Sequence, residues 1–274
     1  MRRAKNAKTR LPATAARFSR LACAGRFMAS RRTASLDQNP MSDKFLLGVS
    51  QLHPCSYLPE QQERLLFSLP EQPLSAEVYQ WLTDHNFRRS GEQLYRPYCL
   101  QCQACQAVRL DVSTLRLSRS QRRLLQQAHR MNWHWRWQQQ PLQQNYFPLY
   151  QAYISMRHAD GVMYPPEPEH LQQLLSCSWL QVSTLEQYVD DQLVGVLVLD
   201  HLPQGLSAVY SFYQPDHALA LGILAVLAGT ELCTQQQLPY FYLGYLVSQS
   251  EKMRYKSQFR PQQRLILDQW QSFC

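Results

Sequence analysis

The segment at residues 180–212, LQVSTLEQYVDDQLVGVLVLDHLPQGLSAVYSF, decides the fold of this 274-residue chain. Apolar and polar side chains alternate through residues 180–188, 193–199 and 208–212, which is the period of strands that bury one face. The pair Gln204-Gly205 supplies a hairpin turn between the last two runs. We therefore predict a meander of three β-strands.

Three helices and one further strand are predicted around this meander. The helices span residues 146–156, 169–176 and 219–233, and the strand spans residues 240–243. The order helix, strands, helix, strand is that of an acetyltransferase-like (GNAT-type) acyl-transfer domain, which we place at residues 146–274. The fold by itself does not assign a function.

The turn before the last of these helices argues against coenzyme A. An acetyl-CoA enzyme needs a glycine-rich turn there, so that backbone amides can reach the pyrophosphate. Residues 215–222, PDHALALG, contain one late glycine and one acidic residue. We therefore expect a different acyl donor.

A smaller α+β module is predicted at residues 41–145. Its strands are expected at residues 45–49, 93–97 and 107–112, and Ser75 caps a helix that ends near Asn86. With the acyl-transfer domain that follows, the fold class is α+β.

Three cysteines in this module, Cys99, Cys102 and Cys105, are separated by two residues each, and Cys55 lies upstream. Thiolates that converge in this way suit a zinc ion or an iron–sulfur cluster, for which Cys55 would be the fourth ligand. Two alternatives stay open: reduced thiols that pack a tight loop, and a redox pair.

The net charge of +8 is unevenly distributed. Residues 1–40 contain ten Lys or Arg and one acid, whereas residues 41–274 contain eighteen Lys or Arg and nineteen acids. The basic segment has the composition of a disordered extension. A transit peptide, a nucleic-acid arm and a start assigned too early all explain it, and we favour the last because Met41 opens the compositionally normal part.

The rest of the composition is that of a globular protein. Since no run approaches the roughly 18 apolar residues of a membrane span, we expect a soluble protein with no membrane partner. We also expect it to be cytoplasmic and monomeric. The tryptophans of NWHWRW at 132–137 alternate with a period of two, which predicts a strand with one aromatic face. Seven arginines against one acid at residues 109–136 fit either an RNA-facing surface or a solvated helix face.

Four motifs resemble the arginyl-tRNA-protein transferase family, and in particular its shorter bacterial branch. They are SAVYSFY at 207–213, YLGY at 242–245, KMRYK at 252–256 and FRP at 259–261. The segments FRRSG at 87–91 and MRHADG at 156–161 and the cysteine segments are similar to it as well. The resemblance covers about residues 42–270. The chain departs from the residues usual in the family at three places, namely Gln214, Leu219-Ala220 and Gln263.

The resemblance implies an enzyme that transfers leucine from leucyl-tRNA to the N-terminal Asp or Glu of proteins, which marks them for degradation. Arginyl transfer, an N-acyltransferase with another donor and a metal-containing RNA-binding module without catalysis are the alternatives. The aminoacyl ester is already activated, so alignment alone contributes roughly 7–11 kcal/mol and the chemistry needs no cofactor.

The resemblance also implies site residues. Tyr245, Tyr255 and Lys256 are expected at the reacting ester, and Lys256 is expected to be exposed and to hold an anion. The predicted substrate-binding residues are Arg157, Tyr210, Phe212, Tyr213, Lys252 and Arg254. A cation among them must read the acidic acceptor. Core packing of the tyrosines, solvation of the lysines and a structural His158 are the alternatives.

Overall fold

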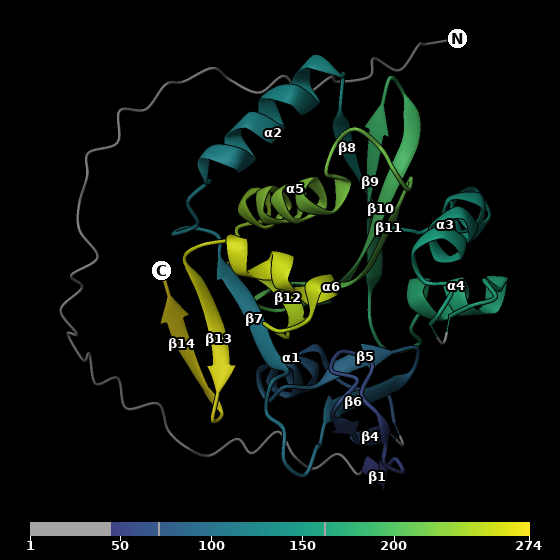
Figure 1. Ribbon diagram of the computed structural model, residues 1–274, viewed down its shortest axis with the longest axis vertical. Coiled ribbons are helices and arrows are strands. Elements are labelled where there is room, and N and C mark those ends of the chain that lie inside the picture. The colour runs from purple at the N-terminus through teal and green to yellow at the C-terminus, as the bar shows by residue number, and fades with distance from the viewer. Residues whose placement is uncertain (1–44, 71, 162) are drawn as a thin grey trace. The chain divides into compact units, whose positions relative to one another are not determined.

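A mixed eight-stranded sheet organises the structure, a computed structural model that describes residues 45–70, 72–161 and 163–274 (Figure 1). The strand order is β14-β13-β7-β12-β11-β10-β9-β8. In chain order the strands are β7 (Gln106–Asp111), β8 (His134–Gln138), β9 (Val182–Val189), β10 (Gln192–Leu202), β11 (Gly205–Tyr213), β12 (Tyr240–Leu246), β13 (Gln262–Ile266) and β14 (Gln269–Phe273). The predicted basic extension at residues 1–40 lies outside the described residues.

The predicted meander is confirmed, because β9, β10 and β11 pair antiparallel in sequence order. Helices cover both faces of the sheet: α5 (Leu221–Gln235) lies on one face, and α3 (Gln143–Arg157) with α4 (Pro168–Leu175) on the other (Figure 1). Leu197 of β10 packs into the core under α5, whereas Val196 and Val198 pack into the core under α3 and α4. Residues 193–199 of β10 form a continuous apolar run, which corrects the predicted alternation, because both faces of the strand are buried.

The alternating tryptophans form the edge strand β8, as predicted. Trp133, Trp135 and Trp137 pack against the core under α5, and their indole N–H groups donate to Gln187, Glu231 and Ser183. They are therefore packing residues. The preceding helix α2 (Arg119–Arg130) begins with a capping box at Ser118 and Gln121, and an RNA-facing role for its arginines stays a prediction.

Strands β11 and β12 are parallel neighbours that separate after a short contact. Only Gly205, Leu206 and Ser207 of β11 pair with β12. A Cβ atom on Gly205 would lie 2.2 Å from the carbonyl oxygen of Tyr240. The close approach of the two strands at this position therefore requires glycine. Beyond Ser207 the two strands diverge, and the sheet opens between them.

Residues before 98 form smaller sheets. The strands are β1 (Phe45–Val49), β4 (Leu65–Pro70), β5 (Arg88–Ser90) and β6 (Gln93–Pro97) in the order β1-β4-β6-β5, and a separate pair β2 (His53–Pro54) with β3 (Gln62–Glu63). Helix α1 (Ala76–Asp84) is capped by Ser75, whose hydroxyl accepts from the Val78 amide. Tyr79 and Leu82 of α1 share a core with Leu202 and Tyr242 of the large sheet.

The observed fold is a mixed α+β fold, as predicted. The large sheet takes β7 and β8 from before residue 145 and its other strands from after it. The predicted boundary between residues 145 and 146 stays a prediction. Two short helical turns, α6 (Glu251–Arg254) and η1 (Tyr255–Gln258), lie between β12 and β13. Within the described ranges, no helix is long and apolar enough to cross a membrane.

Candidate active site

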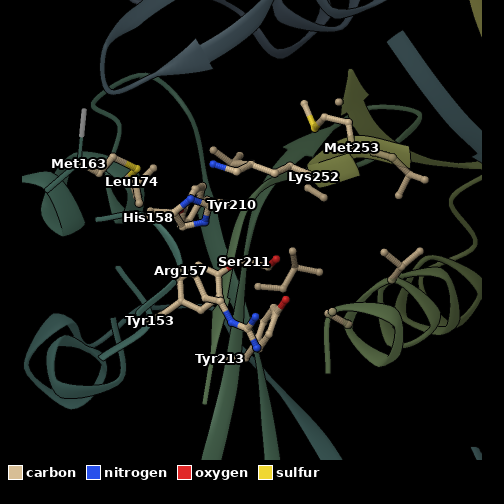
Figure 2. Close-up of a pocket in the computed structure, with 18 of the residues that line it drawn as sticks. Tyr153, Arg157, His158, Met163, Leu174, Tyr210, Ser211, Tyr213, Lys252 and Met253 are labelled. Atoms are coloured by element: carbon tan, nitrogen blue, oxygen red, sulfur yellow. The ribbon is translucent and has the colours of Figure 1, made fainter. Parts of the chain in front are cut away.

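A cleft of about 1140 Å³ opens where β11 and β12 diverge (Figure 2). Its walls come from residues 207–211 of β11, residues 243–245 of β12, the end of α3, the strand β5 and the α6–η1 turns. Segments far apart in the chain therefore meet at one opening in the sheet. Most of the predicted site residues line it.

A bulge in β12 shapes the floor of the cleft. The pairing of β12 with β7 shifts register between Tyr242 and Gly244, and Gly244 has a φ angle of +74°. This left-handed conformation favours glycine. A Cβ atom on Gly244 would lie 3.7 Å from the Nζ atom of Lys256, so the bulge leaves space beside that amine.

Lys256 is buried, with 8% of its surface exposed, and the prediction of an exposed side chain is wrong. The η1 turn directs the side chain inward, where Nζ donates to the Tyr245 carbonyl oxygen at 2.7 Å. Burial, together with the nearby Arg88, lowers the pKa of Lys256 to about 7. A large neutral fraction at pH 7 makes this amine a proton acceptor instead of a permanent cation.

Tyr245 forms part of the cleft wall. Its hydroxyl donates to the Asn86 carbonyl oxygen at 2.7 Å, and its ring lies 5.3 Å from the Arg88 guanidinium. Burial raises the pKa of Tyr245 well above its usual value, so the phenol is no base at neutral pH. Tyr255 also lines the cleft, and burial raises its pKa to about 12.

The two predicted tyrosines of β11 line the cleft, whereas the phenylalanine between them does not. Tyr210 and Tyr213 lie in the wall, where the Tyr213 ring packs 4.8 Å from that of Tyr153 (Figure 2). Phe212 is fully buried and packs edge-on against Tyr150 at 5.5 Å. Because α3 covers β11 at this point, Phe212 is a core residue, which corrects the prediction that it binds substrate.

The predicted cations lie at the rim or outside. Arg157 lines the cleft and pairs with Asp216 at 2.8 Å, and Lys252 lines it and pairs with Asp160 at 3.4 Å. Arg254 does not line the cleft, and its Nη2 atom lies 4.0 Å from Oε1 of Glu251. The rim cations therefore already have carboxylate partners. His158 also lines the cleft, and burial followed by the charge of Lys252 lowers its pKa.

A buried arginine in the lining was not predicted as a site residue. Arg88 begins β5 and is 6% exposed. Its Nη1 atom donates to the carbonyl oxygens of Thr83 and Phe87, whereas Nε and Nη2 have no hydrogen-bond partner among the described residues. The motif FRRSG at 87–91 was a signal in the sequence, but nothing local distinguishes its two arginines.

Comparisons with known proteins identify the family of this chain. The family described as "Arginine-tRNA-protein transferase, C terminus" matches residues 145–266, and the corresponding N terminus matches residues 53–123. A protein of Vibrio parahaemolyticus named "Aspartate/glutamate leucyltransferase" is 40% identical over 226 residues, which is 82% of this chain and 96% of the relative. The chain belongs to the arginine-tRNA-protein transferase family.

Two further proteins are similar to this transferase. A relative of the same name from Shewanella putrefaciens is 39% identical over 86% of this chain and 99% of its own length. Among solved structures, "The structure of L-PGS from Bacillus licheniformis" is similar with a TM-score of 0.43 and 10% identity, over 53% of this chain and 48% of that one.

The second arginine of FRRSG supports the fold of the transferase. Arg89 and Asp200 form a fully buried ion pair at 2.6 Å, and the Tyr79 hydroxyl donates to the same carboxylate at 2.7 Å. Arg89 also donates to four backbone carbonyl oxygens, those of Gly91, Gln173, Leu174 and Ser176. It thereby fastens the end of α4 to β5 and β10.

Two of the departures from the family pattern have visible contacts in this transferase. Gln263 accepts a hydrogen bond from Nε of Arg109 at 2.7 Å, so the amide keeps a contact that an acid would also make. Leu219-Ala220 lines the cleft next to the start of α5, where it offers no charge.

The four predicted metal ligands lie near one another. Burial, followed by the nearby Cys55, Cys99 and Cys102, raises the pKa of Cys105 to about 12. Cys105 shares a small core with Tyr245, so this loop supports the cleft wall. In the described part of the chain, no group of three or more Cys, His, Asp or Glu side chains is arranged to hold a metal ion.

Proposed function

We propose that this transferase conjugates leucine from leucyl-tRNA to the N-terminal Asp or Glu of proteins and so marks them for degradation. The observation that carries the proposal is the similarity, over nearly the full length of the relatives, to proteins named aspartate/glutamate leucyltransferase. The cleft adds a buried amine whose pKa is about 7, which suits a reaction that must deprotonate an α-amine. Since aminoacyl-tRNA is a cytoplasmic substrate, we propose that the protein is cytoplasmic. We also propose that it is a monomer.

The acyl-transfer fold is part of the same proposal. Strand β12 follows β11 after the crossover helix α5 and pairs with it over three residues only, and the cleft opens beyond that pairing. This arrangement supports an acetyltransferase-like domain preceded by a smaller cysteine-containing module. Open backbone edges at the diverging strands supply polar groups that can align the ester with the amine.

The reaction needs one proton acceptor. An α-ammonium group has a pKa of about 7.7–8.0, so its proton passes to neutral Lys256 with little free-energy cost. The acceptor's neutral α-amine then attacks the ester carbonyl carbon, an amide bond forms and the ester C–O bond breaks. The attacking nitrogen loses its second proton, which the leaving tRNA ribose oxygen takes up. The Tyr245 carbonyl oxygen holds Nζ in place throughout. Lys256 thus takes the role of a base in place of the predicted anion contact.

A transfer assay tests this function. The protein is mixed with radiolabelled leucyl-tRNA or arginyl-tRNA and with peptides that begin with Asp, Glu, Lys or Ala. We expect label from leucyl-tRNA on the Asp and Glu peptides only. Label from arginyl-tRNA on the same peptides identifies the arginyl alternative, and tRNA binding without any transfer identifies a non-catalytic module.

We also propose that the four cysteines take up zinc or an iron–sulfur cluster. The donor set is suitable, and the thiols lie close enough to raise the pKa of Cys105, although binding requires the loop at 99–105 to draw them together. Binding releases the thiol protons, so the metal–thiolate bonds must offset the cost that the raised pKa adds to deprotonation. No step of the transfer reaction uses the metal.

Elemental analysis of anaerobically purified protein tests the metal proposal. We expect about one zinc or one cluster per chain, and we expect replacement of Cys102 by Ser to reduce that content. Metal content below about a tenth of an equivalent in fully active protein would leave the thiols with a packing role.

A further inference from the structure

The floor of the cleft contains a buried positive charge without a counter-ion. Arg88 is 6% exposed, and none of the described carboxylates pairs with it. The groups around it include two backbone carbonyl oxygens, the ring of Tyr245, the phenol groups of Tyr95 and Tyr79, and the amine of Lys256. Burial of an unpaired charge is costly, so this arrangement favours a ligand that supplies a negative charge.

The acids of the cleft do not supply that charge. Asp160, Asp200 and Asp216 all line the cleft. Each is already engaged by another cation, namely Lys252, Arg89 and Arg157 respectively. The unmatched positive charge therefore lies at Arg88, next to the proposed base.

The free atoms of Arg88 form one edge of its guanidinium group. Nε and Nη2 lie side by side on that edge, which is the geometry that binds both oxygens of a carboxylate. The neighbouring Arg89 uses the same edge, because its Nε and Nη2 hold the two oxygens of Asp200. The chain therefore shows at Arg89 the contact that Arg88 is free to make.

We infer that Arg88 binds the side-chain carboxylate of the acceptor's first residue and so selects Asp and Glu. This inference rests on the proposed function. Arg88 and Lys256 both contact Tyr245, one at the ring and the other at the carbonyl oxygen, so they lie at one place in the cleft floor. An acidic residue whose carboxylate meets Arg88 presents its α-amine beside Lys256.

The geometry also explains why amides are rejected. An N-terminal Asn or Gln presents an NH2 group to one of the two N–H donors, which leaves a buried donor unpaired. A site built in this way rejects the wrong group by about 10⁴-fold or more. Arg157 and Lys252 at the rim lack this property because they are about half exposed and already paired.

Steady-state kinetics of Arg88→Met and Arg88→Lys test the inference, with Asp-, Glu-, Asn- and Gln-started peptides and with leucyl-tRNA varied separately. For Arg88→Met we expect kcat/KM for the Asp and Glu peptides to fall by about 100-fold or more. We expect the KM for leucyl-tRNA to stay unchanged and the preference for Asp over Asn to collapse. Arg88→Lys keeps the positive charge but lacks the two adjacent N–H donors. We therefore expect a smaller fall in kcat/KM for the Asp and Glu peptides than in Arg88→Met, and no change in the KM for leucyl-tRNA.

Arg96→Met is the matched control. Arg96 also stacks on an aromatic ring, that of Phe87 at 5.2 Å, but it does not line the cleft. We expect parental kinetics for it. Circular dichroism and melting identify any variant that fails to fold, in which case Arg88→Lys carries the test.

Two results would overturn the inference. A raised KM for leucyl-tRNA with unchanged acceptor selectivity would make Arg88 a tRNA phosphate contact. Unchanged kinetics for both acidic peptides would give Arg88 a packing role only. Failure of the proposed function is distinguishable, because the parent protein would then transfer no leucine to any peptide.

Discussion

Replacement of Lys256 by Met lowers leucine transfer by about 10²–10⁴-fold, which is the usual contribution of a positioned base. The methionine keeps the length of the side chain but cannot take the α-ammonium proton. Initial rates with leucyl-tRNA and an Asp-started peptide measure the loss. We expect the KM values for both substrates to change little, because Lys256 acts on the proton and not on binding.

The pH profile separates a base from a charge. Since the neutral form of Lys256 is active and its pKa is about 7, the rate of the parent should fall as the pH drops below 7 and reach a plateau above it. Lys256→Arg keeps a permanent charge and should be as inactive as the Met variant at every pH. Restored activity in the Arg variant would show that Lys256 contributes charge instead.

Stability provides an independent check of the same burial. The pKa of Lys256 is about 7 in the folded state, against about 10.4 for an unfolded lysine, so the unfolded state binds more protons between these values. The stability of the parent should therefore rise as the pH increases through that window. The unfolding free energy of Lys256→Met should increase less with pH than that of the parent. At pH 7 the variant should melt at a temperature no lower than that of the parent.

Replacement of Asp200 by Ala costs about 3–5 kcal/mol of unfolding free energy, because it leaves the Arg89 guanidinium buried without its partner. The Tyr79 hydroxyl loses its acceptor at the same time. Urea denaturation followed by circular dichroism measures the change. We expect the variant to be partly unfolded at 37 °C.

Asp216→Ala is the matched control for this prediction. Asp216 also pairs with an arginine, Arg157, but both side chains are about half or more exposed, so its removal should cost less than about 1 kcal/mol of unfolding free energy. Equal losses in the two variants would show that the buried pair contributes no more than a surface pair.

The periodic parts of the fold were predictable from the sequence. The three strand segments within residues 180–212, the tryptophan strand β8 and the helix cap at Ser75 depend on residues within a few positions of one another. The family motifs in 207–261 were recognisable for the same reason, since each is a short run. Such motifs predict Tyr210 and Tyr213 as substrate-binding residues, and both line the cleft.

Burial and partner choice were decided only by the tertiary structure. The sequence by itself determined that Arg88 and Arg89 follow each other, but the large sheet brings Asp200 to one of them and leaves the other beside Tyr245. It determined equally that Lys256 belongs to the basic motif KMRYK, whereas the η1 turn buries its amine and lowers its pKa. Local patterns report on neighbours in the chain, and the charge of a buried group depends on segments that only folding brings together.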